Sequence, residues 1–154
     1  MSEDLRTVGN PGSDDFRLDA YPFYLLNRAA SRYNMKLEAQ LRRIGVDIPT
    51  WRALMVLGDR EPLAIGQVAR SAAINLSTMM RIVERMAKAG LVETGTSETD
   101  GRVTEIRMTP EGRAKLAEAR GVAAPLYEKI IGGFSASDFS RMLELLGRLY
   151  DNLD

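Results

Sequence analysis

Hydrogen-bond donors gather on one face of a short segment in the middle of the chain. They are the hydroxyl and guanidinium groups of Ser77, Thr78, Arg81 and Arg85. No acidic residue interrupts that face before Glu84. Hydroxyl groups can bind phosphate oxygens, and the fork of an arginine can pair with O6 and N7 of guanine in a major groove. Met80 offers an apolar contact, such as one to a thymine methyl group. The face therefore has the chemistry to bind duplex DNA.

A second charged group lies further along the chain, in the polar loop Asp100-Gly101-Arg102. Arg102 can enter a minor groove, because the negative potential of a narrow groove attracts a cation. Asp100 can hold the guanidinium group in place through charge-assisted hydrogen bonds. We count both with the DNA-binding residues, with Arg102 reading groove shape and Asp100 supporting it without touching DNA.

Both groups also have a simpler interpretation. The arginines of the helix could lie on a solvated face, with intrahelical ion pairs such as Arg81–Glu84 or Glu84–Lys88. Residues 100–102 could form an ordinary turn, since aspartate and glycine favour turns. Met80 could pack against a neighbouring helix like many methionines.

The donors belong to the second helix of a predicted helix-turn-helix. Asn75 is a suitable N-cap for this helix and joins the candidate DNA-binding residues. The opposite face carries apolar residues at helical spacing, namely Leu76, Met79, Ile82, Val83 and Met86. A two-turn helix over residues 65–71 precedes it, and β-rich segments over residues 91–94 and 103–108 follow it on either side of a polar loop. A helix-turn-helix followed by a hairpin is a winged helix.

Longer helices flank this unit. Asp19 is expected to cap the first, with Pro22 in its first turn, and Gly45 to end it. Its apolar period is carried by Leu26, Ala29, Ala30, Tyr33, Leu37 and Leu41. A short helix should begin at Asp47 and end at Gly58 as its C′ residue.

Two helices are predicted after the hairpin, capped by Thr109 and Ser135. We expect a bend or break near Gly121 and Pro125 in the first of them. The last carries a wide apolar stripe formed by Phe139, Met142, Leu143, Leu146, Leu149 and Tyr150. A terminal helix this apolar needs a partner, such as the N-terminal helix or a second copy of the chain.

The predicted fold is mainly α with a small β-hairpin: a winged helix-turn-helix core flanked by N- and C-terminal dimerisation helices. We expect a flexible arm over residues 1–18 and a single domain over residues 19–154. Within that domain the dimerisation helices span about 19–45 and 110–154, and the winged helix spans about 47–109.

Composition excludes several classes of function. The 154 residues are 45% hydrophobic and 27% charged, which fits one soluble domain with a sizeable core. The absence of cysteine and histidine removes disulfides, thiol chemistry and the commonest metal ligand and general base. We therefore predict no metal, no cofactor and no enzymatic activity. No segment is apolar enough to span or target a membrane, so a cytoplasmic location is expected.

Three stretches resemble the MarR family of winged-helix transcriptional regulators. Residues 74–86 are similar to the family's recognition helix, with its Ser-Thr pair and following arginine. Residues 88–92, Lys-Ala-Gly-Leu-Val, are similar to its turn before the wing. Asp100-Gly101-Arg102, followed by residues 108–112 (Met-Thr-Pro-Glu-Gly), matches its wing and the start of its next helix. The resemblance covers about residues 19–150.

This resemblance implies a ligand pocket between the dimerisation helices and the winged-helix core. The candidate residues are Arg17, Tyr24, Asn27, Arg28 and Trp51. An arginine can hold a carboxylate while a tyrosine or tryptophan contacts an aromatic ring. A small aromatic acid or its thioester is therefore the expected effector. Alternatively, the aromatic residues could be core residues and the arginines surface charges.

Together these observations predict a homodimeric repressor that binds a pseudo-palindromic operator and is released by an aromatic effector. The competing hypothesis is a winged-helix module for protein–protein contact, which the formal net charge of zero favours.

Overall fold

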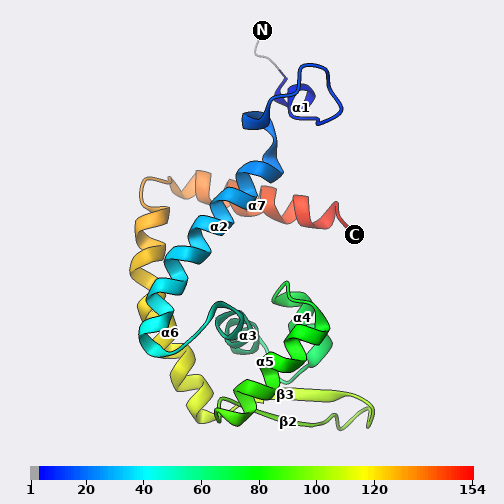
Figure 1. Ribbon diagram of the computed structural model, residues 1–154, viewed down its shortest axis with the longest axis vertical. Coiled ribbons are helices and arrows are strands. Elements are labelled where there is room, and N and C mark those ends of the chain that lie inside the picture. Colours follow the sequence, from blue (N-terminus) through cyan, green and yellow to red (C-terminus); the bar gives the residue numbers. More distant parts are fainter. Residues whose placement is uncertain (1–3) are drawn as a thin grey trace.

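The computed structural model describes residues 4–154, and its mainly helical architecture with a small antiparallel sheet confirms the predicted fold class (Figure 1). The helices are α1 (Leu5–Val8), α2 (Pro22–Leu41), α3 (Ile48–Asp59), α4 (Ile65–Ser71), α5 (Leu76–Lys88), α6 (Pro110–Ile131) and α7 (Ala136–Asp151). The 3-10 turns η1 (Leu18–Ala20) and η2 (Arg42–Ile44) lie on either side of α2. The strands are β1 (Leu63–Ala64), β2 (Val92–Thr96) and β3 (Thr104–Met108).

The sheet has the strand order β1-β3-β2, with both pairs antiparallel. Ile106 lies at its centre, opposite Leu63 on one side and Thr94 on the other. The predicted hairpin is thus confirmed, with strand bounds shifted by one or two residues. The strand β1 was not predicted, because two residues are too short to show the alternation typical of a strand.

The hydrophobic core lies within the winged helix, around α3. Its most deeply buried large side chains are Leu37, Leu41, Leu54, Leu57, Val68, Met79, Met86 and Ile106. The C-terminal end of α2 and the part of α6 from Gly112 to Leu126 complete this core from outside the winged helix. The winged helix is therefore fixed directly to the helices that were predicted to mediate dimerisation.

Most predicted helix starts are confirmed by their capping hydrogen bonds. The side chains of Asp47, Asn75, Thr109 and Ser135 each accept a hydrogen bond from a backbone N–H of the first turn. Asp19 is an exception, because α2 begins at Pro22 with Tyr21 as its N-cap. The Asp19 carboxylate instead pairs with Arg17, whose hydrogen bonds lower the pKa of Asp19.

Two glycine positions show how closely α6 approaches its neighbours. Gly58 does not end α3 as predicted; the helix continues to Asp59, and a Cβ atom at Gly58 would lie 2.5 Å from Leu116 Cδ2. A Cβ atom at Gly112 would lie only 2.0 Å from the carbonyl oxygen of Leu91. Gly58 therefore lets α3 pack closely against α6, and Gly112 lets α6 approach the backbone of Leu91. That helix is continuous through Pro125, so the predicted break does not occur.

The N-terminal segment is more structured than an extended lead-in. Residues 4–18 contain the single turn α1, and the Val8 side chain is buried. The backbone N–H of Arg17 donates to the Val8 carbonyl at 2.7 Å and folds the segment back on itself. Residues 1–3 of the predicted arm lie outside the described residues, and the flexibility of the arm stays a prediction.

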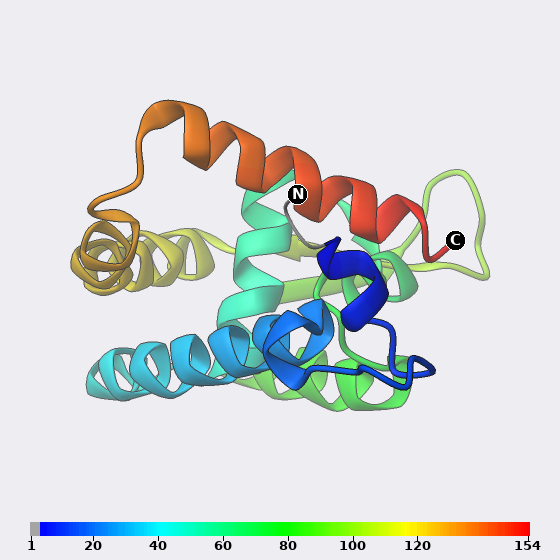
Figure 2. The ribbon, with the colours of Figure 1, turned by 90° about the horizontal axis from the view of Figure 1, so that it is seen from above.

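The outer helices leave much of their apolar surface uncovered. In α2, Leu37 and Leu41 are buried as predicted, but Leu26 and Tyr33 are exposed. No residue of α7 is buried, and its predicted stripe is half-buried at most. Figures 1 and 2 show α7 apart from the winged helix, to which it is joined through α6. No helix within residues 4–154 combines the length and apolar character required to cross a bilayer.

Candidate nucleic-acid interface

The helix α5 has a buried apolar face and an exposed face that carries the predicted donors. Met79, Ile82, Val83 and Met86 are buried as predicted. Leu76 is the exception at 51% exposure, because it occupies the first helical position at the edge of the stripe. Met80 is also exposed, at 55%, so its interpretation as a core residue is wrong. The exposed face therefore combines polar and apolar groups.

The start of α5 contains a small hydrogen-bond network around the Asn75 side chain. Asn75 Oδ1 accepts from the Thr78 backbone N–H at 2.8 Å and from the Ser77 hydroxyl at 2.9 Å. The proton of Ser77 Oγ is thus used within the cap, so a phosphate contact through that proton would compete with Asn75. Within residues 4–154 the Thr78 hydroxyl has no side-chain or backbone partner, which leaves it free to donate.

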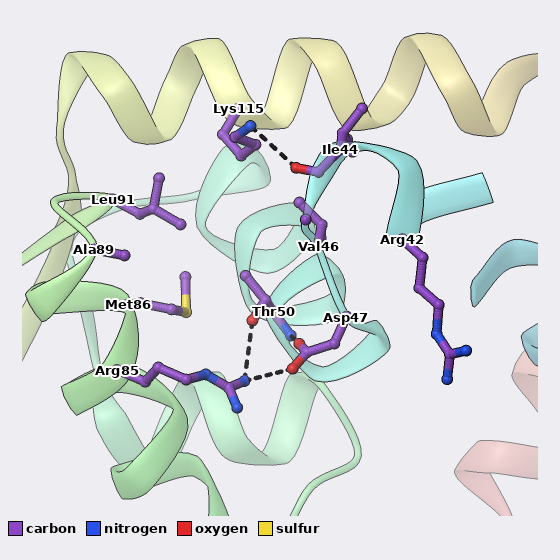
Figure 3. A pocket seen from close by; sticks show the side chains of 11 residues that line it. Arg42, Ile44, Val46, Asp47, Thr50, Arg85, Met86, Ala89, Leu91 and Lys115 are labelled. Carbon is purple, nitrogen blue, oxygen red and sulfur yellow. Dashed lines mark hydrogen bonds and ion pairs between the residues drawn. The ribbon is translucent and has the colours of Figure 1, made fainter. Parts of the chain in front are cut away.

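Arg81 and Arg85 differ in their surroundings although both are exposed. Arg85 Nη2 donates to Asp47 Oδ2 at 2.7 Å and to Thr50 Oγ1 at 3.3 Å (Figure 3). Among the described residues, Arg81 forms no ion pair. The predicted alternative pair Glu84–Lys88 does form, at 3.2 Å. Arg81 is therefore available to a ligand, whereas Arg85 links α5 to the start of α3.

Asp47 connects α3 and α5 through its two carboxylate oxygens. Oδ1 accepts from the Thr50 backbone N–H at 2.9 Å and caps α3, while Oδ2 accepts from Arg85. Lys115 of α6 donates to the carbonyl oxygen of Ile44 at 3.3 Å nearby. These contacts lie around an open cavity of about 510 Å³ between η2, α3, α5 and α6 (Figure 3). Sequence reasoning missed this cluster, since its members are separated by long stretches of chain.

The wing carries Arg102 at the tip of the β2–β3 hairpin. Asp100 Oδ1 accepts from the Arg102 backbone N–H at 3.0 Å, while the shortest distance to its guanidinium group is 3.8 Å, at Nε. The Arg102 side chain is 96% exposed. Asp100 thus shapes the turn more than it clamps the guanidinium, because an exposed pair at that distance contributes little. The turn interpretation and a projecting Arg102 are both compatible with this geometry.

The predicted ligand-binding residues do not all come together. Tyr24, Asn27 and Arg28 line one open hollow of about 690 Å³ on α2, and the Arg28 guanidinium carbon lies 5.2 Å from the centre of the Tyr24 ring. Arg17 is not part of that hollow and pairs with Asp19. Trp51 is only 9% exposed and packs in the core, which its sequence position on a short amphipathic helix could not distinguish from a pocket wall.

All residues that line this hollow belong to α2, so no other element within residues 4–154 lines it. Two further residues missed by sequence reasoning, Arg32 and Met35, extend it along the helix. Their spacing from Arg28 by about one and two turns was the available signal. Among residues 4–154 no cluster of carboxylates could hold a metal ion.

The chain is similar in sequence and structure to known proteins of one family. Residues 44–103 match the model of the MarR family. The chain is 34% identical over 145 residues to the HTH-type transcriptional repressor IacR of Pseudomonas putida. The aligned region covers 94% of this chain and 87% of the relative. The name of this relative describes a transcriptional repressor.

Solved structures show the same fold. A MarR family regulator from Silicibacter pomeroyi has a TM-score of 0.82 and 25% identity, covering 90% of this chain and 93% of its own. The repressor CouR, solved bound to a 23-mer DNA duplex, has a TM-score of 0.76 and 19% identity, covering 86% and 94%. The confirmed winged helix and the extended similarity to IacR lead to one conclusion: this chain belongs to the MarR family of winged helix-turn-helix transcriptional regulators.

Proposed function

We propose that the chain is a homodimeric, ligand-responsive repressor that binds a pseudo-palindromic operator. The observation that carries the proposal is the exposed face of α5. Within residues 4–154, Arg81 has no ionic partner and the Thr78 hydroxyl has no hydrogen-bond partner. The wing residue Arg102 is exposed as well. The repressor function named for IacR and the DNA bound to CouR support it.

Each DNA-binding residue receives a distinct task in this proposal. Arg81 reads a guanine through its fork, and Thr78 donates to a phosphate. Arg102 enters the minor groove, and Asp100 shapes the turn that presents it. Asn75 and Ser77 act together through the cap, which holds the first turn rigid. Arg85 positions α5 through Asp47, in place of the direct contact predicted for it.

A second copy of the chain would bind the apolar surface of the outer helices. The exposed large side chains there include Phe23, Leu25, Leu26, Tyr127, Ile130, Leu143, Leu146 and Tyr150. An exposed apolar surface of this extent on helices that flank the core is typical of an interface. Symmetric pairing of two chains through this surface would place their two α5 helices in successive major grooves, about 34 Å apart.

The hollow on α2 supports an effector site that the second copy completes. Tyr24 can contact an aromatic ring, and Arg28 and Arg32 can neutralise a carboxylate. Binding there would favour one relative orientation of the two chains. A small aromatic acid or its thioester would then weaken operator binding by moving the recognition helices away from the operator spacing.

The decisive experiment is a gel shift with a duplex selected by the full chain from a random-sequence library. Arg81→Ala should weaken binding about 5- to 150-fold for each half-site contact that is lost, because a bidentate contact contributes about 1–3 kcal/mol. Arg43→Ala is the matched control, since Arg43 is an exposed arginine on η2 that does not line the cavity shared with α5. Equal affinities of Arg81→Ala and the control would remove α5 from the DNA interface.

The competing function is a winged-helix module for protein–protein contact, favoured by a formal net charge of zero. The two are separated by the salt dependence of binding to random duplex DNA. Phosphate contacts release counterions, so a steep loss of affinity between about 50 and 200 mM salt marks a DNA-binding surface. No binding to any duplex would favour the interaction module.

A further inference from the structure

We infer that Leu76 and Met80 form an apolar edge of α5 that reads the C5-methyl groups of two nearby thymines in each operator half-site. This inference rests on the proposed function and adds a sequence preference to it. The edge was not apparent from the helical period, which assigns Leu76 to the buried stripe. Only its observed exposure separates Leu76 from that stripe and places it with Met80.

The exposure of these two side chains is unusual within the winged helix. Among residues 46–109, the large hydrophobic side chains that are exposed are Met55, Leu76 and Met80, so two of the three lie on α5. The core side of the same helix is already filled by four other apolar residues. Leu76 and Met80 therefore do not serve the packing of their own chain.

The spacing of Leu76 and Met80 places their side chains next to each other on the same side of α5. Four residues apart on a helix, they lie on the same side and about 6 Å apart along the axis. Successive base pairs are about 3.4 Å apart, so the two side chains can reach positions about two base-pair steps apart. Both lie in the first two turns of α5, and in helix-turn-helix proteins it is the N-terminal part of the recognition helix that contacts base edges.

The chemistry of the major groove selects the occupant of this edge. Among the four bases, only thymine presents a methyl group there, and the other groups of the groove are hydrogen-bond donors and acceptors. A flexible methionine can adapt its thioether to such a group. Arg81 follows Met80 directly and has no ionic partner within the described residues. The edge therefore predicts a half-site in which thymines lie close to a guanine.

Dimerisation does not account for the exposure of these residues. The apolar surface assigned above to a second copy lies on α2, α6 and α7. In both views α5 lies apart from α7, which carries the most exposed part of that surface (Figures 1 and 2). The apolar edge instead lies on α5, the helix whose exposed side carries Ser77 and Arg81.

Replacement of thymine by deoxyuridine tests the inference, because it removes the methyl group and keeps base pairing and the O4 acceptor. The probe is the duplex that the full chain selects from a random library, synthesised with each thymine replaced singly and bound in salt-matched gel shifts. In each half-site we expect about fourfold weaker binding when either of two thymines, within about two base-pair steps of each other, is replaced; this is the change expected when one methyl-sized group loses its burial.

Alanine variants then assign each methyl group to a side chain. Met80→Ala should bind more weakly and lose the response to deoxyuridine at one of the two positions, and Leu76→Ala should lose it at the other. Met55→Ala on α3 is the matched control and should keep both responses. Because Leu76 and Met80 are half exposed, the variants should unfold at the temperature of the parent chain, which thermal circular dichroism checks.

Three results would overturn the inference. Equal binding of thymine and deoxyuridine duplexes by the parent chain would show that no methyl group is read. An unchanged response in both alanine variants would assign the methyl contacts to other residues. In either case, weaker binding by Arg81→Ala would still support the proposed function. Failure to select or bind any duplex would overturn the inference and the proposed function together.

Discussion

The helices α5 and α7 are both amphipathic, but they differ in what covers their apolar faces. Each begins with a side-chain cap, at Asn75 and Ser135, and each carries an apolar stripe along one face. In α5 the stripe is buried against neighbouring elements of the same chain, whereas no residue of α7 is buried. The uncovered surface of α5 is a mixed polar face, whereas the uncovered surface of α7 includes its apolar stripe. The comparison teaches that amphipathicity predicts a helix but not the partner that covers it.

Because the apolar stripe of α7 is uncovered, a charge placed on it should have the largest effect on dimerisation and operator affinity. Leu146→Asp should give a monomer in size-exclusion chromatography with light scattering, because a carboxylate would be buried at the interface. Operator affinity should fall more than about 100-fold, since the second half-site loses its tethered partner. Ser140→Asp, on the polar side of α7, is the control, and truncation after Gly133 should reproduce the monomer. A Leu146→Asp dimer of normal affinity would contradict the assignment of α7.

A conservative change at Arg81 should have the next largest effect. Arg81→Lys keeps the charge but removes the bidentate fork, so it should lose about 1–3 kcal/mol of discrimination for one base pair. The salt dependence of binding should stay unchanged, because the number of cations is unchanged. Competition between the selected duplex and single-base variants measures the discrimination. If Arg81→Lys keeps its preference at every position, Arg81 contacts phosphate alone.

Arg102→Ala should weaken binding by a smaller and more uniform factor. The guanidinium group projects from the wing tip with a distant ionic partner, so it contributes mainly through groove potential. We expect a loss of about 3- to 10-fold and a decrease of about 1 per protomer, or about 2 for the dimer, in the slope of log affinity against log salt concentration. The dimer should survive, as measured by chromatography. An unchanged slope would place the wing away from DNA.

The smallest effect is expected for Arg85→Ala. Its pair with Asp47 is half exposed, and such pairs contribute below about 1 kcal/mol to stability. Operator affinity should fall no more than about threefold, with an unchanged salt slope, because Arg85 orients α5 and does not contact phosphate. Asp47→Asn, which keeps an oxygen to cap α3, should give a similar loss. A decrease of about 1 per protomer in the salt slope for Arg85→Ala would restore the original prediction of a direct DNA contact.

Local signals predicted much of the fold because they act over a few residues. The caps at Asn75 and Thr109 and the two-turn helix α4 were predicted at the observed positions. Capping and helical period depend on neighbours within about one turn, so the sequence contains the required information. The wing hairpin was predicted for the same reason, with uncertain strand ends.

The candidate site was predicted less completely, because its residues depend on distant partners. Nothing in the order of residues indicates that Arg85 meets Asp47 or that Trp51 is enclosed by the core. A helical period places each side chain on a face and cannot say what that face meets. Leu76 is the clearest case, since its period indicates burial and its surroundings leave it exposed.

The sequence by itself determined the recognition module: a capped amphipathic helix with donors on one face, followed by a turn and a hairpin with an arginine at its tip. These features follow from local backbone preferences and periodicity. Only the tertiary structure decided which of these side chains are available, since it paired Arg85 with Asp47 and left Arg81, Leu76 and Met80 uncovered. The physical reason is that hydrogen bonds and burial are satisfied by whatever lies nearest in space, and spatial neighbours are set by the packing of the whole chain.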